Sequence, residues 1–193
     1  MGVAGLDPAL EDSVRRYEGA LEKCHDVLSG LGEASAQHKP AQGWSVAQCI
    51  DHLIVAGALM VARLEEAIQR ARELSREARS SRPAKFGWFD KLFIWAVGSG
   101  KDGKPSTRVK TGGAFEPGPG RSIAILESEF IALQDRLIQA AKSAQGLDLA
   151  GIKVRSVLND SIQVALGAWF IAIAAHQERH LEQAARTRKE IGR

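Results

Sequence analysis

The sequence has few cysteines, no long hydrophobic run and no strong excess of charge of either sign. Its two cysteines, Cys24 and Cys49, are too few for a disulfide framework. No apolar stretch reaches the ~18–20 residues that a membrane-spanning helix needs. Residues 1–6 have neither the basic nor the apolar region of a secretory signal. These absences predict a cytoplasmic protein with reduced cysteines and no contact with a membrane.

The charge is small and dispersed. The chain has 26 lysines and arginines against 23 acidic residues, which gives a formal net charge of +3. The basic residues are spread over 70–85, 101–110 and 179–193, each mixed with acids or followed by glycine. Because a nucleic-acid-binding protein concentrates its charge on one face, we expect a solvated surface and no nucleic-acid partner. Hydrophobic residues make up 45% of the chain, which is enough for a core, and its length predicts one domain over 1–193.

Four stretches carry apolar residues at helical spacing, and no stretch shows the alternation of a strand. The first opens at Asp7-Pro8, a helix-capping residue followed by proline at the first helical position. The second opens with a capping box from Ser45 to Gln48. This pattern predicts an all-α protein, a four-helix bundle. The predicted helices are 8–31, 46–76, 122–145 and 165–190, with 184–193 as the polar tail of the last.

Residues 77–120 are too long for a plain connection, since loops beyond ~12–15 residues usually carry function or disorder. They include an aromatic segment, expected to form a short helix over 87–97, with Gly98 to Lys104 as a solvated loop. The segment could be a lid over one end of the core, a dimer surface or a pocket wall, and a membrane anchor is the least favoured reading. Its aromatic residues are Phe86, Trp88, Phe89, Phe93 and Trp95.

Two histidines, His176 and His180, are four residues apart and therefore lie on one helix face, where both could bind one metal ion. The spacing alone fits two exposed histidines equally well. Their position at the change from apolar to polar sequence favours a metal site, as does His52 on the strongly capped second helix. In an antiparallel bundle, a residue near the start of one helix can face one late in another. Three neutral imidazoles leave a coordination position open, as in catalytic zinc sites.

The residues around these histidines exclude one class of enzyme. A zinc protease of the His-Glu-x-x-His type needs glutamate directly after the first histidine, and this chain has Gln177 there. The inverted motif fails as well, because position 179 is arginine.

Other polar residues are weaker candidates. Cys49 could be a thiolate ligand, but a buried contact with Trp44 in a hydrophobic staple is favoured. Three residues of the last helix could orient a ligand from outside the site, although a solvated role is favoured for each: Glu178, Glu182 and Gln183. Structural or exposed roles are predicted for His25, His38 and Trp169.

Several segments together resemble the DinB-like superfamily, which includes YfiT-type thiol transferases. They are the Gly-Trp-Ser-Val-Ala-Gln-Cys-Ile-Asp-His-Leu segment at 43–53, Phe115-Glu116-Pro117, and the Leu-Gly-Ala-Trp-Phe and Ala-His-Gln-Glu-Arg-His-Leu-Glu-Gln segments at 166–170 and 175–183. The resemblance covers most of the chain in matching order. Many members carry glutamate where this chain has Gln48 and Gln177.

The resemblance implies an up-down-down-up bundle, often a homodimer, with a divalent metal ion, zinc or nickel. By motif position, the ligands are His52, His176 and His180. The implied function is that of a metal-dependent thiol S-transferase or hydrolase, in which the metal activates a thiol or water. The substrate would be a small molecule, with a low-molecular-weight thiol as a further partner. The alternative is a non-catalytic, dimeric stress-response module that binds metal or a ligand. No residue is identified as the general base.

Overall fold

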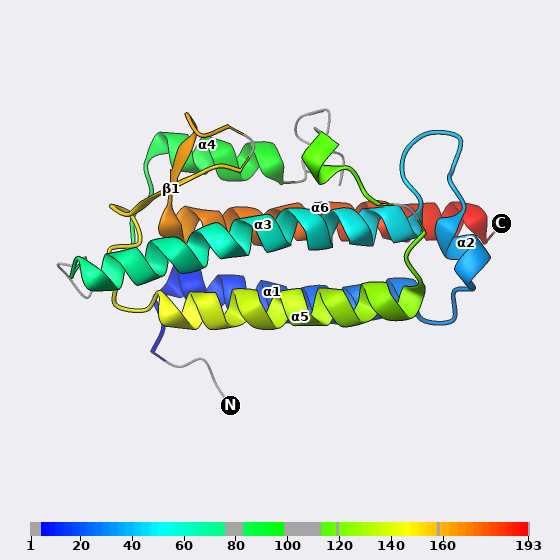
Figure 1. Ribbon diagram of the computed structural model, residues 1–193, viewed down its shortest axis with the longest axis horizontal. Helices are drawn as coiled ribbons and strands as arrows, with labels where there is room; N and C mark the ends of the chain where they lie inside the picture. Colours follow the sequence, from blue (N-terminus) through cyan, green and yellow to red (C-terminus); the bar gives the residue numbers. More distant parts are fainter. Residues whose placement is uncertain (1–4, 76–82, 99–112, 119, 158, 193) are drawn as a thin grey trace.

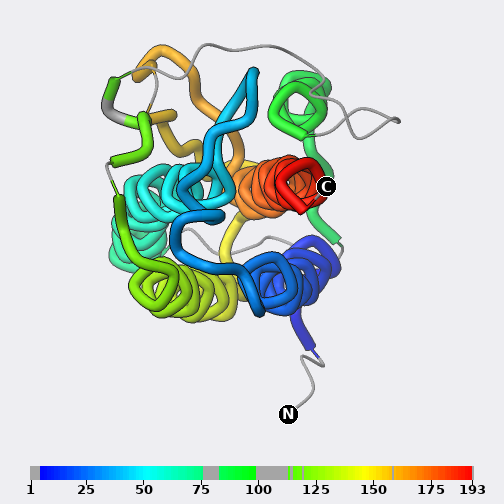
Figure 2. Tube along the Cα trace, turned by 90° about the vertical axis from the view of Figure 1, so that its right-hand side faces the viewer, coloured from blue at the N-terminus to red at the C-terminus, as the bar shows by residue number. Residues whose placement is uncertain are grey.

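The fold is a bundle of four long helices, seen from the side in Figure 1 and end-on in Figure 2. The computed structural model describes residues 5–75, 83–98, 113–118, 120–157 and 159–192. The helices run up, down, down and up, with α1 beside α5 in one layer and α3 beside α6 in the other. This confirms the predicted all-α bundle. The long helices are α1 (Pro8–Leu28), α3 (Val46–Glu73), α5 (Ile123–Ser143) and α6 (Leu166–Ile191).

The predicted capping residues start the first two long helices. Asp7 accepts a hydrogen bond from the backbone N–H of Ala9 at 2.9 Å, with Pro8 in the first turn. Both halves of the capping box at Ser45 and Gln48 form, at 3.1 and 3.2 Å. Such caps satisfy backbone N–H groups that have no partner inside the helix, so they fix where the helix begins.

The long connection follows from the topology, since α3 and α5 run in the same direction and the chain must return along the bundle between them. It contains the predicted short helix, α4 (Trp88–Val97), which packs on the outside of α6 (Figure 2). Two short helical elements were not predicted: α2 (Glu33–Gln37) and the 3-10 turn η1 (Gly113–Phe115). Of the loop predicted from Gly98 to Lys104, only Gly98 lies within the described residues.

A β-hairpin precedes α6, where the sequence showed no strand pattern. Strands β1 (Lys153–Arg155) and β2 (Gln163–Ala165) pair antiparallel, with Val154 opposite Val164. Both valines are buried, and the indole N–H of Trp169 donates to the carbonyl of Val154 at 3.0 Å. The expectation of no strands was wrong here because a three-residue strand is too short to display an alternating pattern.

The buried carboxylate of Asp90 joins α4 to the hairpin. It accepts hydrogen bonds from the N–H groups of Gly87 and Ala165, at 3.2 and 2.9 Å, and lies 3.3 Å from the ammonium group of Lys153. Three donors on one ionised group make strong, oriented contacts. Asp90 therefore fixes α4 and the hairpin relative to the start of α6.

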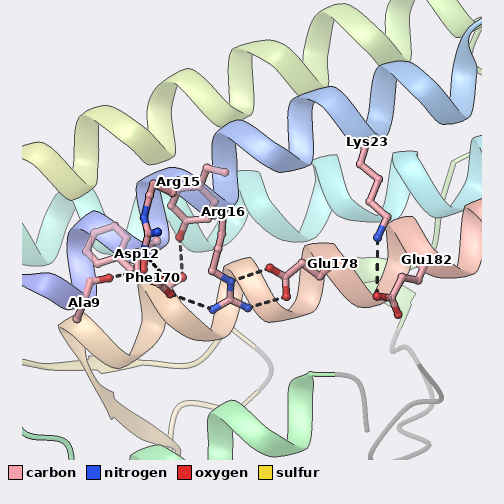
Figure 3. Close-up of polar contacts among 10 residues, drawn as sticks. Ala9, Asp12, Arg15, Arg16, Lys23, Phe170, Glu178 and Glu182 are labelled. Atoms are coloured by element: carbon pink, nitrogen blue, oxygen red, sulfur yellow. Dashed lines mark hydrogen bonds and ion pairs between the residues drawn. The ribbon is translucent and has the colours of Figure 1, made fainter. Parts of the chain in front are cut away.

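Polar contacts also hold α1 against α6 (Figure 3). The guanidinium of Arg16 makes two hydrogen bonds of 2.7 Å to the carboxylate of Glu178. Lys23 lies 3.7 Å from Glu182. The buried hydroxyl of Tyr17 donates to the carbonyl of Phe170 at 2.7 Å. The acidic groups of α6 are thus directed at α1.

Helix α3 is the most apolar of the long helices. By length and composition it could cross a membrane, but 61% of its most apolar window is buried inside the bundle. Close contact with α5 requires glycine at position 57, where a Cβ atom would lie 2.5 Å from a methyl carbon of Leu133. These features are those of a core helix.

Candidate metal centre

Three histidines converge between α3 and α6. His52 comes from α3, and His176 and His180 come from successive turns of α6. One ring nitrogen from each lies within 4.8 Å of the others. The Nε2 atoms of His52 and His176 are 3.4 Å apart. The structure therefore brings together all three residues that the sequence analysis selected.

The spacing and chemistry of this cluster suit a metal ion. A zinc ion bound tetrahedrally by imidazole, at ~2.0–2.1 Å from each nitrogen, sets its nitrogen ligands about 3.3–3.4 Å apart. The 3.4 Å between His52 and His176 matches that separation. Imidazole is also a preferred ligand of both zinc and nickel. With one ring nitrogen of each histidine within 4.8 Å of the others, the three side chains could converge on one divalent ion.

In two of the three imidazole rings, a hydrogen bond determines which nitrogen is free to bind a metal ion. The Nδ1 atom of His52 lies 2.8 Å from the carbonyl oxygen of Phe115, and that of His180 lies 3.2 Å from the amide oxygen of Gln183. Because both partners are acceptors, each Nδ1 carries the hydrogen and each Nε2 keeps its lone pair. Contacts of this kind orient the histidine ligands of metal sites. Gln183 is therefore in contact with the site, whereas the sequence analysis favoured a solvated role.

The surroundings keep the imidazoles neutral. Burial lowers the pKa of His52, of His180 and of His176, the last to about 3. The nearby charge of Arg179 lowers all three pKa values further. A neutral imidazole is the form that binds a metal ion, so at neutral pH the cluster offers lone pairs rather than positive charges.

An aromatic ring covers one side of the cluster. The indole of Trp44 stacks on His180, with centroids 5.6 Å apart and an interplanar angle of 22°. It also lies 4.7 Å from the ring of His52. The sequence analysis assigned Trp44 only to the hydrophobic staple. The one feature of the sequence that linked Trp44 to the site was its place in the 43–53 segment, which resembles the family.

Asp51, which directly precedes His52 in the sequence, anchors the chain segment whose carbonyl contacts His52. Asp51 is buried, accepts a hydrogen bond from the N–H of Gly118, and lies 3.0 Å from the guanidinium of Arg121. These contacts hold the segment that carries the carbonyl of Phe115. Asp51 thus supports the orientation of His52 through a second segment of the chain, a role the sequence did not indicate.

A cavity of about 170 Å³ adjoins the three histidines. Its walls come from α3, α4, α6, the hairpin and Phe115, and most of the side chains are apolar. Phe93 of α4 lines it and meets Trp169 edge-on at 4.7 Å. The pocket-wall reading of the aromatic segment therefore holds for Phe93. Trp169, expected in the core, also lines the cavity.

The remaining candidates lie away from the cluster. Cys49 is fully buried in the core, and burial raises the pKa of its thiol to about 12. Cys24 is buried too, and its pKa is likewise raised to about 12. His25 is exposed, with Nδ1 2.8 Å from a carboxylate oxygen of Glu127, and His38 is exposed. The structural or exposed roles predicted for Cys49, His25 and His38 agree with their positions.

These observations define a class of protein, a four-helix bundle with an inward-facing group of three histidines beside an apolar cavity. The model of the DinB superfamily matches residues 16–184, so the chain belongs to that superfamily. No curated protein and no solved structure shows a significant match.

Proposed function

We propose that the protein is a divalent-metal-dependent enzyme, a thiol S-transferase or hydrolase that acts on a small molecule. In this proposal His52, His176 and His180 hold a zinc or nickel ion. The observation that carries it is the meeting of three ring nitrogens within 4.8 Å of one another beside a cavity of about 170 Å³. Three histidine ligands with an open position are the arrangement of catalytic rather than structural zinc sites.

The chemistry of the proposal needs a nucleophile. A dication at this site would lower the pKa of a thiol or of water, so that either could react near neutral pH. The thiols of Cys24 and Cys49 are buried with pKa values near 12, so neither suits the role. The nucleophile would therefore be a low-molecular-weight thiol or water from solution.

The chain's own residues have distinct tasks in this reaction. Phe115 and Gln183 orient the rings of His52 and His180 through their Nδ1 atoms. The apolar cavity walls bind the body of the substrate and exclude water from it. We place the reaction in the cytoplasm and expect the protein to work as a homodimer.

One observation favours a second candidate, a non-catalytic stress-response module that binds metal or a ligand. Among the described residues that line the cavity there is no aspartate or glutamate. A carboxylate is a common general base, and without one the metal alone would have to activate the nucleophile.

A turnover assay separates the two candidates. Protein loaded with zinc or with nickel is mixed with a panel of small thiols and electrophiles, and separately with small esters, and loss of thiol or ester is followed. The enzyme reading predicts turnover that His180→Ala abolishes and that His25→Ala, which removes an exposed histidine away from the site, leaves intact. Bound metal without turnover in either metal form would favour the binding module.

A further inference from the structure

Among the described residues, the wall of the cavity beside the histidines includes one arginine and no carboxylate. Arg179 lines it, from a position on α6 between His176 and His180. Its guanidinium is half-buried and donates one long hydrogen bond, 3.4 Å, to the carbonyl of Val97. Within the described part of the chain, no carboxylate lies within ion-pair distance of it, and none lines the cavity.

Three other arginines that contact the bundle differ in this respect, while Arg72 and Arg188 each donate to two or more backbone carbonyls. Arg16, Arg121 and Arg136 each meet a carboxylate at 3.0 Å or less. A guanidinium stays protonated in proteins, so burial without an acidic partner leaves a charge that is poorly compensated. Among the described residues the charge of Arg179 therefore has no acidic partner, and an anionic ligand would supply one.

A second polar group in the same cavity wall has no hydrogen-bond partner among the residues that the structure describes. Gln177 is 1% exposed, and neither its amide nitrogen nor its amide oxygen makes a hydrogen bond. Buried amides in native proteins are nearly always satisfied, so an exception calls for an explanation. Gln177 lines the cavity next to Arg179 in the wall of α6. Both amide atoms are covered by the cavity wall, so a ligand with a neutral donor or acceptor group would satisfy Gln177 once its side chain turns toward the cavity.

The rest of the cavity limits the size and character of the ligand. An apolar protein cavity of about 150 Å³ admits benzene, and this one is about 170 Å³. Its apolar walls include Leu53, Met60 and Ile173, together with the rings of Phe93 and Trp169. The ligand body is therefore apolar and about the size of one six-membered ring.

We propose that the cavity binds a small organic carboxylate. Its carboxylate would pair with Arg179, its ring-sized apolar body would fill the cavity, and Gln177 would take a neutral polar group when the ligand carries one. A guanidinium matches a carboxylate in a planar, two-bond geometry. This inference rests on the proposed function, because it takes the carboxylate to be the substrate of that enzyme. The contact between the carboxylate and Arg179 does not need the metal.

Calorimetric titration with two matched probes tests the proposal. Phenylacetate and phenylacetamide have the same ring and nearly the same shape but differ in charge. Each is titrated into the zinc-treated and the metal-free protein. We expect phenylacetate to bind at least ~10-fold more tightly than phenylacetamide, because the free energy that a hydrogen bond to a charged group contributes corresponds to at least that ratio of dissociation constants. Arg179→Gln should remove most of the difference in both preparations, and Arg136→Gln, on the exposed face of α5, should leave it unchanged.

The outcomes separate this proposal from the metal proposal. Equal binding of the two probes to the wild-type protein overturns the carboxylate proposal, and so does the absence of phenylacetate binding. This comparison needs no variant, so it decides the matter even if Arg179→Gln fails to fold. An unchanged preference in a folded Arg179→Gln also overturns it. If the protein takes up no zinc, the proposed function fails, while the metal-free titration still tests Arg179.

Discussion

Two of the three imidazoles of the site are oriented by contacts of different origin. The ring of His180 is held by Gln183, one turn further along its own helix. The ring of His52 is held by the carbonyl of Phe115, which belongs to the long connection. Trp44 packs against both rings from just before α3. The position of His52 therefore depends on tertiary structure, whereas that of His180 is largely local.

The exposed pair of His25 and Glu127 gives a pH-dependent prediction at this scale. The hydrogen bond that the imidazole of His25 donates to Glu127, together with the charge of that carboxylate, raises the pKa of His25 above the ordinary 6.5. A raised folded pKa means that the pair stabilises the fold fully below the ordinary pKa. That contribution is lost as pH rises through the raised value.

An NMR titration of the imidazole protons measures this shift. The pKa of His25 should lie above 6.5 in the wild type and return toward 6.5 in Glu127→Gln. Glu129→Gln serves as the control, because Glu129 pairs with Arg121 instead. A pKa of His25 that does not respond to Glu127→Gln would show that the pair does not form in solution.

The two cysteines give a second residue-scale prediction. Burial raises the pKa of each thiol to about 12, and the thiolate is the reactive form. At pH 8 the folded protein should react slowly with a thiol reagent, and both thiols should react at once in denaturant. A thiol that reacts rapidly in the folded state would contradict an external source for the nucleophile.

At the residue scale, the sequence identified the histidines but not their partners. The four-residue spacing joins His176 to His180 on any helix, and the family resemblance added His52. The contacts of Trp44, Asp51 and Phe115 could not be predicted, because each joins segments that only the folded chain brings together. The lack of a carboxylate partner for Arg179 among the described residues is of the same kind, since it depends on what surrounds the cavity.

At the scale of elements, the segment that follows η1 links the connection to the metal centre. Asp51 contacts Gly118 and Arg121 on either side of the turn into α5. The substitution Asp51→Asn removes the charge that holds this turn, so the carbonyl of Phe115 should lose its fixed position. Because loss of an outer contact to a ligand costs ~10–100-fold in metal affinity, we expect a fall of about tenfold or more.

Competition with a chromophoric chelator measures that affinity. Asp135→Asn, an exposed change on α5, is the matched control and should bind metal as the wild type does. Equal affinity in Asp51→Asn and wild type would mean that the carbonyl of Phe115 is held without Asp51.

The elements themselves could be predicted to different degrees. The starts of α1 and α3 followed from Asp7, Pro8 and Ser45, because capping is a local interaction. The hairpin could not be predicted, since its strands have three residues each and Val154 and Val164 are buried by pairing and by Trp169. The five-residue helix α2 could not be predicted either, because no side-chain cap marks its start.

At the scale of the whole molecule, chain direction assembles the site. Helices α3 and α6 run antiparallel, so His52, near the start of α3, meets His176 and His180 near the middle of α6. The return of the chain between α3 and α5 then sets α4 and Phe115 over the same region. The long connection is therefore a part of the site as well as a link.

The outer face of α4 offers a surface for the predicted homodimer. Trp88 is 77% exposed and Trp95 is 56% exposed, with Phe89 and Leu92 beside them. Large exposed apolar patches commonly mark interaction sites. Light scattering should give the mass of two chains for the wild type and of one chain for Trp88→Glu combined with Trp95→Glu. Ile131→Glu, on the exposed face of α5, is the control, and a wild-type mass of one chain contradicts the prediction.

The metal content of the purified protein tests the central claim most directly. After growth or dialysis with zinc or nickel, followed by removal of loosely bound ions, elemental analysis should find about one equivalent per chain, as expected for a single three-histidine site. His180→Ala should lose most of that metal, and His25→Ala should keep it. A wild-type content far below one equivalent, or a content unchanged by His180→Ala, would contradict the metal centre.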